Sequence, residues 1–144
     1  MRDERREIKR DMKRPHRHGG LASYLARNQF EPAEERADGA IVLVFDEKYR
    51  VFCRPAPRGD LVLETTLTAL PEDAGRCDAL LDEALRLAAP SLDTRADALV
   101  LSEDERALLL QRRLSADAAS DEFEQGLEQF VNATGAWRRW LGVL

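Results

Sequence analysis

The sequence predicts an α+β fold: a short helix, a three-stranded antiparallel meander, a helix, a further β-hairpin and a long C-terminal helix. Two observations carry this prediction. Between residues 40 and 71, apolar residues alternate or run together in short segments, which is typical of strands. Outside this stretch, most apolar residues recur at the three- and four-residue spacing of a helix. Three strands cannot bury an apolar face alone, so we expect the helices to pack against them.

Length and composition favour one globular domain that lies in the cytoplasm. The chain has 144 residues, of which 44% are apolar and 34% are charged. No apolar run approaches the roughly 20 residues that a membrane span needs, so we expect no membrane insertion. The two cysteines, Cys53 and Cys77, are too few for a disulfide framework, and small buried thiols are the favoured interpretation.

Charge is distributed unevenly along the chain. Residues 1–20 carry eight Arg and Lys against four Asp and Glu, whereas the other 124 residues carry 14 against 23. This pattern predicts a basic N-terminal extension, residues 1–20, on an acidic domain, residues 21–144. The interspersed acids and the lack of aromatic residues argue against a nucleic-acid partner. His16 and His18 lack a neighbouring Cys or carboxylate cluster, so we expect no metal site.

A short helix is predicted from Leu21 to Gln29, after Gly19-Gly20 breaks the arm. Its apolar residues follow helical spacing and continue into the next aromatic residue: Leu21, Tyr24, Leu25 and Phe30. A helix this short is unstable alone, so it must dock on the rest of the chain or receive a partner.

The meander comprises the runs Ile41–Phe45, Tyr49–Arg54 and Leu61–Leu70, which short polar connectors separate. Because side chains alternate along a strand, the third run should place one set of residues on a single face: Leu61, Leu63, Thr65, Leu67 and Ala69. One face of the sheet should therefore be dry and the other partly hydrated.

A second helix should run from about residue 73 to 89, since Pro71 and Asp73 precede it and Pro90 follows it. Its residues form one apolar stripe: Cys77, Leu80, Leu81, Ala84, Leu85 and Ala88. Residues 91–96 are a polar connector. The stripe contains small residues that would let a partner helix approach closely.

The segment from Asp97 to Leu114 carries conflicting local signals. Ser102 to Glu105 has the form of a capping box that opens a helix. Alternatively, residues 98–101 and 106–112 are two strands about a tight turn. Local propensity favours the helix slightly.

The last helix is predicted to begin after Ser115, a plausible N-cap, and to run to about Trp140. One face is aromatic and aliphatic: Phe123, Leu127, Phe130, Val131, Trp137 and Leu141.

The chain carries no convincing catalytic set, so we expect neither an enzyme nor a cofactor. It has no Gly-rich phosphate loop after a strand and no GxSxG motif, and both histidines fall in the arm, where nothing should fix a tautomer. Cys53 alternates with Val51 on a strand face, which favours packing over nucleophilic chemistry. The helices instead carry more apolar surface than so few strands can cover, which predicts protein binding.

The order of segments resembles a known family. IVLVFDEKYRVFC and DLVLETTLTALP precede DALLDEALRLAAP, DALVLSEDERALLLQRRL and a final FVNATGAWRRWL. From about Leu21 to Leu141 this pattern is similar to type III secretion chaperones of the Tir chaperone (CesT-like) family. In that family the region matching residues 97–113 is a strand pair, so we predict the hairpin.

The resemblance implies a homodimeric bacterial chaperone without enzymatic activity or ATP. Such proteins bind the N-terminal segment of a secreted effector and keep it soluble, extended and competent for secretion. A regulatory adaptor of the same fold, which binds a transcriptional regulator or anti-activator, is the alternative. The basic arm is longer than is usual in the family and suggests an extra contact, with an acidic client segment or a secretion ATPase.

Carried onto this sequence, the resemblance assigns two surfaces. The expected dimer interface comprises Leu80, Leu81, Ala84, Leu85, Leu99, Leu101, Leu108 and Leu110. The expected effector-binding residues are Leu21, Tyr24, Leu25, Phe30, Val51 and Cys53. For the strand residues, an ordinary place in the core is an equally good interpretation.

Overall fold

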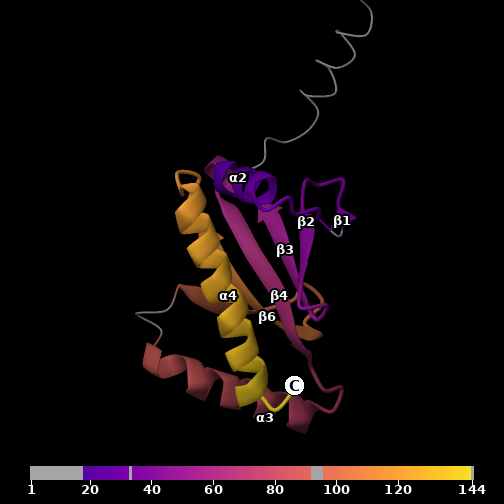
Figure 1. Cartoon of the computed structure of the whole chain (residues 1–144). Helices are drawn as coiled ribbons and strands as arrows, with labels where there is room; N and C mark the ends of the chain where they lie inside the picture. Colours follow the sequence, from indigo (N-terminus) through magenta and orange to yellow (C-terminus); the bar gives the residue numbers. More distant parts are fainter. Residues whose placement is uncertain (1–17, 33, 92–95, 144) are drawn as a thin grey trace, which may run out of the picture.

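One antiparallel sheet and the helices that pack against it form the chain (Figure 1). The computed structural model describes residues 18–32, 34–91 and 96–143. In chain order the elements are α2 (Gly19–Arg27), β1 (Glu34–Glu35), β2 (Ile41–Phe45), β3 (Tyr49–Pro55), β4 (Leu61–Ala69), α3 (Ala74–Ala88), β5 (Asp97–Leu101), β6 (Ala107–Leu114) and α4 (Ser120–Trp140), with 3₁₀ turns at Pro57–Gly59 and Ala89–Ser91. The predicted α+β class and order of elements are confirmed.

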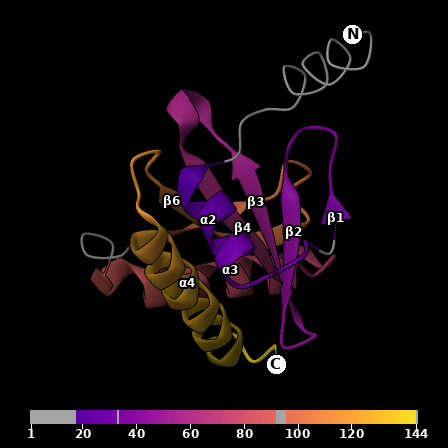
Figure 2. The ribbon, with the colours of Figure 1, turned by 45° about the horizontal axis from the view of Figure 1, so that its top comes forward.

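The six strands of the described ranges form the order β1-β2-β3-β4-β6-β5, and each neighbouring pair is antiparallel. The later hairpin extends the meander through β6, which pairs along β4, while β5 lies at the edge. Figures 1 and 2 show α4 crossing one face of this sheet, with α2 near one end of α4 and α3 near the other.

The hairpin predicted for residues 97–114 is confirmed. Ser102 closes its turn, because its hydroxyl accepts hydrogen bonds from the backbone N–H groups of Arg106 (3.2 Å) and Ala107 (3.0 Å). Glu105 takes a positive φ of 58° within the turn. The residues that resemble a helix cap therefore satisfy the backbone of a turn, which is the other common use of such side chains.

The core lies between the sheet and α4. Its largest fully buried side chains are Trp137, Phe123, Phe130, Ile41, Leu43, Leu63 and Leu110. The three aromatic residues come from α4, and the aliphatic ones come from β2, β4 and β6. The aromatic face predicted for the last helix is thus the face that covers the sheet.

The opposite face of the sheet is partly hydrated, as predicted. Phe52 lies there beneath the guanidinium carbons of Arg36 and Arg54, which are 4.8 and 6.0 Å from its ring centroid. Glu64, only 8% exposed, accepts a 2.6 Å hydrogen bond from Gln111 and lies 3.2 Å from Arg54. These contacts compensate a charge that would otherwise be costly to bury.

Two predicted helix starts were wrong. The first helix begins at Gly19 and includes both glycines, because the side chain of His18 caps it. The last helix begins at Ser120 and not after Ser115. The hydroxyl of Ser115 accepts from the N–H of Asp117 (3.2 Å) in a turn that precedes the helix. The two-residue strand β1 is an addition that the sequence did not predict.

Strand β4 also departs from simple alternation near its end. Its pairing with β6 shifts between Thr66 and Thr68, so Leu67 is the extra residue of a bulge. Leu67 stays buried, but Ala69 is exposed and does not share the core face, contrary to the prediction.

In the parts of the chain that the structure describes, no helix is long and apolar enough to cross a membrane. Residues 1–17 of the predicted arm, and residues 92–95 of the connector, lie outside the described residues.

Replacing Phe130 with alanine should lower the free energy of unfolding by about 3 to 5 kcal/mol, because a fully buried ring is lost and a cavity remains. Urea denaturation followed by circular dichroism measures the change. Val143→Ala is the control, since Val143 is 38% exposed and its loss should matter little. Equal effects of the two substitutions would contradict the packing of α4 on the sheet.

Candidate protein-binding site

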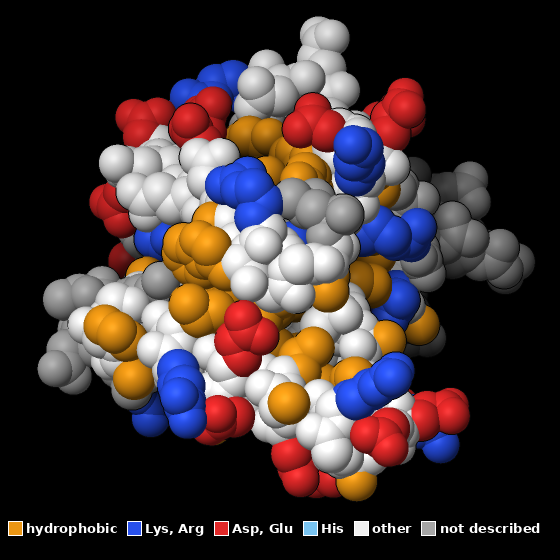
Figure 3. Space-filling model, turned by 90° about the horizontal axis from the view of Figure 1, so that it is seen from below, with side chains coloured by type: hydrophobic (Ala, Val, Ile, Leu, Met, Phe, Trp, Pro, Cys, Tyr) orange, Lys and Arg blue, Asp and Glu red, His pale blue; other side chains and the backbone are white. Residues whose placement is uncertain are grey.

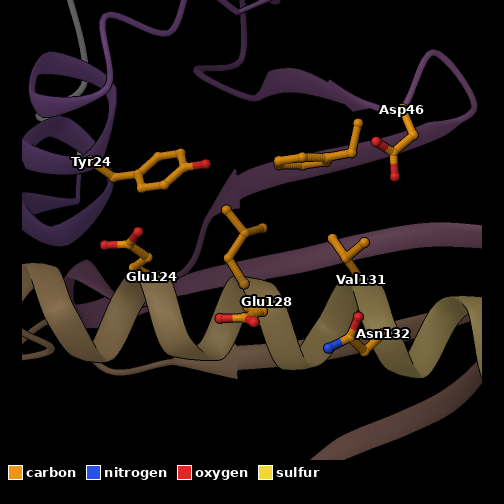
Figure 4. A pocket seen from close by; sticks show the side chains of 8 residues that line it. Tyr24, Asp46, Glu124, Glu128, Val131 and Asn132 are labelled. Carbon is orange, nitrogen blue, oxygen red and sulfur yellow. The ribbon is translucent and has the colours of Figure 1, made fainter.

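A pocket lies between α2, the end of β2 and α4 (Figure 4). Its volume is about 280 Å³, and its lining residues are Tyr24, Phe45, Asp46, Glu124, Leu127, Glu128, Val131 and Asn132. Tyr24 and Phe45 bring aromatic rings to it, and Leu127 and Val131 bring aliphatic side chains from α4. Carboxylates stand around this apolar part, so the pocket combines a hydrophobic floor with an acidic rim.

His18 fixes the start of α2. Its Nδ1 accepts a hydrogen bond from the N–H of Leu21 (3.3 Å), which satisfies one free donor at the helix start. Its Nε2 lies 2.6 Å from the carbonyl oxygen of Ser115, just before α4. Since a carbonyl only accepts, these partners place the hydrogen on Nε2. The expectation that nothing would fix the tautomer of this histidine was therefore wrong.

Gly20 allows α2 to approach α4 closely. A Cβ atom at this position would lie 2.8 Å from Cβ of Phe123 and 3.1 Å from the carbonyl oxygen of Ala118. Only glycine leaves enough room for the observed separation. Gly19-Gly20, predicted to break the chain before the helix, instead lies inside α2, and Gly20 makes the contact with α4.

Four aromatic rings connect α2 to the sheet and to α4. The ring of Tyr24 lies 5.4 Å from that of Phe123 and 6.2 Å from that of Phe30, and Phe30 lies 5.8 Å from Phe45. These separations fall in the range of favourable tilted ring pairs. Phe123 is fully buried, whereas the other three are partly exposed. The chain thus presents an aromatic surface that its own packing covers incompletely.

The electrostatic character of the pocket is negative. Burial, and secondarily the negative charge of Glu124, raises the pKa of the Tyr24 hydroxyl above its ordinary value. Arg27 of α2 lies 2.7 Å from Glu124 and 3.4 Å from Asp121, and these exposed pairs link the end of α2 to the first turns of α4. Such pairs contribute little energy each. The rim is acidic because its carboxylates outnumber this one cation.

The predicted effector-binding residues divide into two groups. Leu21, Leu25, Val51 and Cys53 are buried in the core of the chain. Tyr24 and Phe30 are partly buried and keep accessible surface, Tyr24 in the pocket itself. All six belong to one continuous region around α2 and the meander. Their role in effector binding stays a prediction.

The predicted dimer residues divide in the same way. Ala84, Leu108 and Leu110 are buried within the chain, and Leu80, Leu81 and Leu99 are partly buried. Leu85 on α3 and Leu101 on β5 are 67% and 44% exposed. Figure 3 views the side on which α3 lies and shows hydrophobic side chains near the middle of this face with charged side chains around them. The dimer itself stays a prediction.

Sequence reasoning missed the acidic rim. Glu124 and Glu128 are four residues apart and therefore lie on one side of α4, next to Leu127 and Val131. That spacing was a usable signal. The contribution of Asp46 was not predictable, because it depends on how the β2–β3 turn approaches α4.

The thiol of Cys53 is buried in the core, where nucleophilic chemistry is disfavoured. Burial raises its pKa to about 12, so the reactive thiolate is scarce at neutral pH. Among the residues that the structure describes, no group of three or more His, Cys, Asp or Glu side chains is placed to hold a metal ion.

Helices on a single face of an antiparallel sheet, incompletely covered aromatic side chains and a pocket with an acidic rim are typical of one class: proteins that bind other polypeptides. Sequence comparison gives the family. Residues 20–138 match the model of the Tir chaperone protein (CesT) family, and the chain belongs to that family. The Chlamydia pneumoniae protein CPj0713/CpB0740 is 31% identical over 110 residues, which cover 74% of this chain and 81% of that protein.

Solved structures share the fold. The HopA1–SchA chaperone–effector complex matches with a TM-score of 0.60 and 14% identity, over 81% of this chain and 88% of the other. The Yersinia pestis type III secretion chaperone SycH, in complex with a fragment of YscM2, gives 0.58 and 16%, over 83% and 98%. YbjN of E. coli, described as a candidate transcription regulator, gives 0.58 and 14%, over 82% and 85%. The fold is thus that of type III secretion chaperones.

Gly20→Ala should push α2 away from α4 and lower the free energy of unfolding by about 1 to 3 kcal/mol, as overpacking usually does. Gly19→Ala is a matched control, because nothing lies within 4 Å of a Cβ there and alanine favours helix. Thermal denaturation compares the two variants. A Gly20→Ala protein as stable as Gly19→Ala would contradict the close contact of α2 with α4.

Cys53 should resist maleimide labelling at pH 8 in the folded protein, because its thiol is fully buried and its pKa is about 12. Mass spectrometry after timed labelling measures the modification of each cysteine. Both cysteines should react once guanidinium unfolds the chain. Rapid labelling of Cys53 without denaturant would show that the core around β3 opens readily.

Proposed function

We propose that this protein is a type III secretion chaperone that binds the N-terminal segment of a secreted effector and keeps it soluble, extended and competent for secretion. The observation that carries the proposal is the incompletely covered aromatic surface of Tyr24, Phe30 and Phe45 beside the pocket. A folded partner would need a broad complementary face, whereas an extended segment can follow a narrow apolar surface and place single side chains in a pocket.

The sheet edge supports the same proposal. Strand β5 has a neighbour on one side only in the described sheet, so its outer edge offers backbone groups for pairing. An added strand would supply main-chain hydrogen bonds, while the apolar surface would select alternate side chains. An effector segment loses conformational entropy when it is held extended, and the burial of apolar area must offset this loss.

We further propose that two copies form a homodimer through α3. This helix buries only the small residues Ala84 and Ala88 in the core of its own chain. Leu85 remains 67% exposed on α3, and Leu101 and Trp140 add further exposed apolar surface elsewhere on the chain. An isologous contact between two α3 helices would cover the exposed leucine of each copy.

A regulatory adaptor is the second candidate function, and the fold shared with YbjN favours it. An adaptor would use the same apolar surface to hold a transcriptional regulator or anti-activator. The two functions differ in the fate of the partner, since an effector leaves the cell and a regulator does not.

Leu85→Asp should convert the dimer into a monomer, because it places a charge in the proposed interface. Size-exclusion chromatography with light scattering measures the mass. Glu83→Gln, an exposed change on the same helix, is the control and should leave the dimer intact. A monomeric unmodified protein would refute the dimer.

The full chain should capture a protein that the same cell secretes, and the isolated N-terminal segment of that protein should be sufficient for binding. Affinity capture, mass spectrometry and titration with the purified segment test this. Tyr24→Asp should weaken binding at least about tenfold, because it places a charge on the aromatic surface. Capture of a non-secreted regulator alone would favour the adaptor.

A further inference from the structure

The pocket between α2 and α4 has an unbalanced charge. Asp46, Glu124 and Glu128 surround a floor of Leu127 and Val131 (Figure 4). Arg27 partly compensates Glu124, from which it lies 2.7 Å away. Among residues 18–32, 34–91 and 96–143, no cation forms an ion pair with Asp46 or Glu128. The pocket therefore offers two carboxylates that the described part of the chain leaves unpaired.

The shape of the pocket restricts what can enter it. A volume of about 280 Å³ admits a side chain or two but not a helix or a folded element. The aromatic rings of Tyr24 and Phe45 and the aliphatic side chains of α4 suit an apolar stem. The carboxylates suit a cationic end, which the ring faces also attract. Arginine and lysine are the two residue types that combine both properties, and the planar guanidinium of arginine stacks better on rings.

We propose that this pocket anchors an arginine or lysine side chain of the effector segment. Its methylene groups lie against Leu127 and Val131, and its charge lies near Asp46 and Glu128. The inference rests on the proposed function and specifies which segments bind: the bound effector segment carries a basic residue among apolar ones. Apolar contact alone would not distinguish such a segment from any other unfolded chain, whereas the acidic rim does.

The basic residues 1–17 of the chain itself are the competing occupant. Arg27 already compensates the part of the rim nearest the first turns of α4, against which His18 also packs. The unpaired carboxylates lie further along α4 and on the β2–β3 turn. This distribution favours a segment of another molecule that crosses the pocket.

The test uses two tripeptide probes, acetyl-Leu-Arg-Leu-amide and the same peptide with neutral citrulline in place of arginine. Methyl NMR of the full chain, labelled at Leu and Val, measures affinity and location together. The arginine peptide should bind about fivefold more tightly than the citrulline peptide, as one or two exposed ion pairs allow. The shifted signals should include Leu127 and Val131. High salt should reduce the difference.

Asp46→Asn with Glu128→Gln should bring the two affinities within about twofold. Glu103→Gln is the matched control, because Glu103 is an exposed acid on the β5–β6 turn and does not line the pocket. Equal binding of both peptides to the unmodified chain, or no binding of either, would overturn the anchor. Binding of the arginine peptide only after removal of residues 1–17 would assign the pocket to the chain's own arm and would also overturn it.

Effector capture separates this inference from the proposed function. If the double variant captures the effector segment as tightly as the unmodified chain, the function stands and the anchor fails. If the arginine peptide is preferred but no secreted protein is captured, the proposed function fails, and the assignment of the occupant fails with it. If the double variant captures the segment several times more weakly, both are supported.

Discussion

The packing of α2 across the first turns of α4 is the contact on which the binding surface depends. Two features make it possible: the absent side chain of Gly20, and the hydrogen bonds of His18 to the start of α2 and to Ser115, in the turn before α4. A nine-residue helix would not be stable alone, so α2 depends on its packing against α4 for stability. The pocket lies beside this contact, between α2, α4 and the end of β2.

The chain leaves two kinds of apolar surface uncovered, and they differ in chemistry. The surface on α3 is dominated by aliphatic leucine and is set on a regular helix, which suits a repeated contact with an identical helix. The surface beside α2 is aromatic, is interrupted by a pocket and is bordered by acids. A rigid self-complementary face favours one fixed partner, whereas an irregular face with a charged border favours selection among extended segments.

The sequence was sufficient for the sheet and the helices because their apolar periods are strong. The stripe of α4 and the runs of β2, β3 and β4 each have a single consistent interpretation. The hairpin of residues 97–114 required the resemblance to the family, because Ser102 fits a helix cap and a turn equally well. His18, Gly20 and Asp46 were misjudged or missed because their roles arise from contacts between elements distant in sequence. The bulge at Leu67 likewise depends on pairing with β6.

The arginine-covered face of the sheet has a consequence for solubility. Phe52 would offer a flat aromatic surface for stacking of sheet on sheet, yet Arg36 and Arg54 cover its ring and Glu64 adds a charge beside it. Face-to-face assembly would have to remove water from these charged groups, which is costly. The charges over Phe52 therefore disfavour the dry contact between stacked sheets from which fibrils are built.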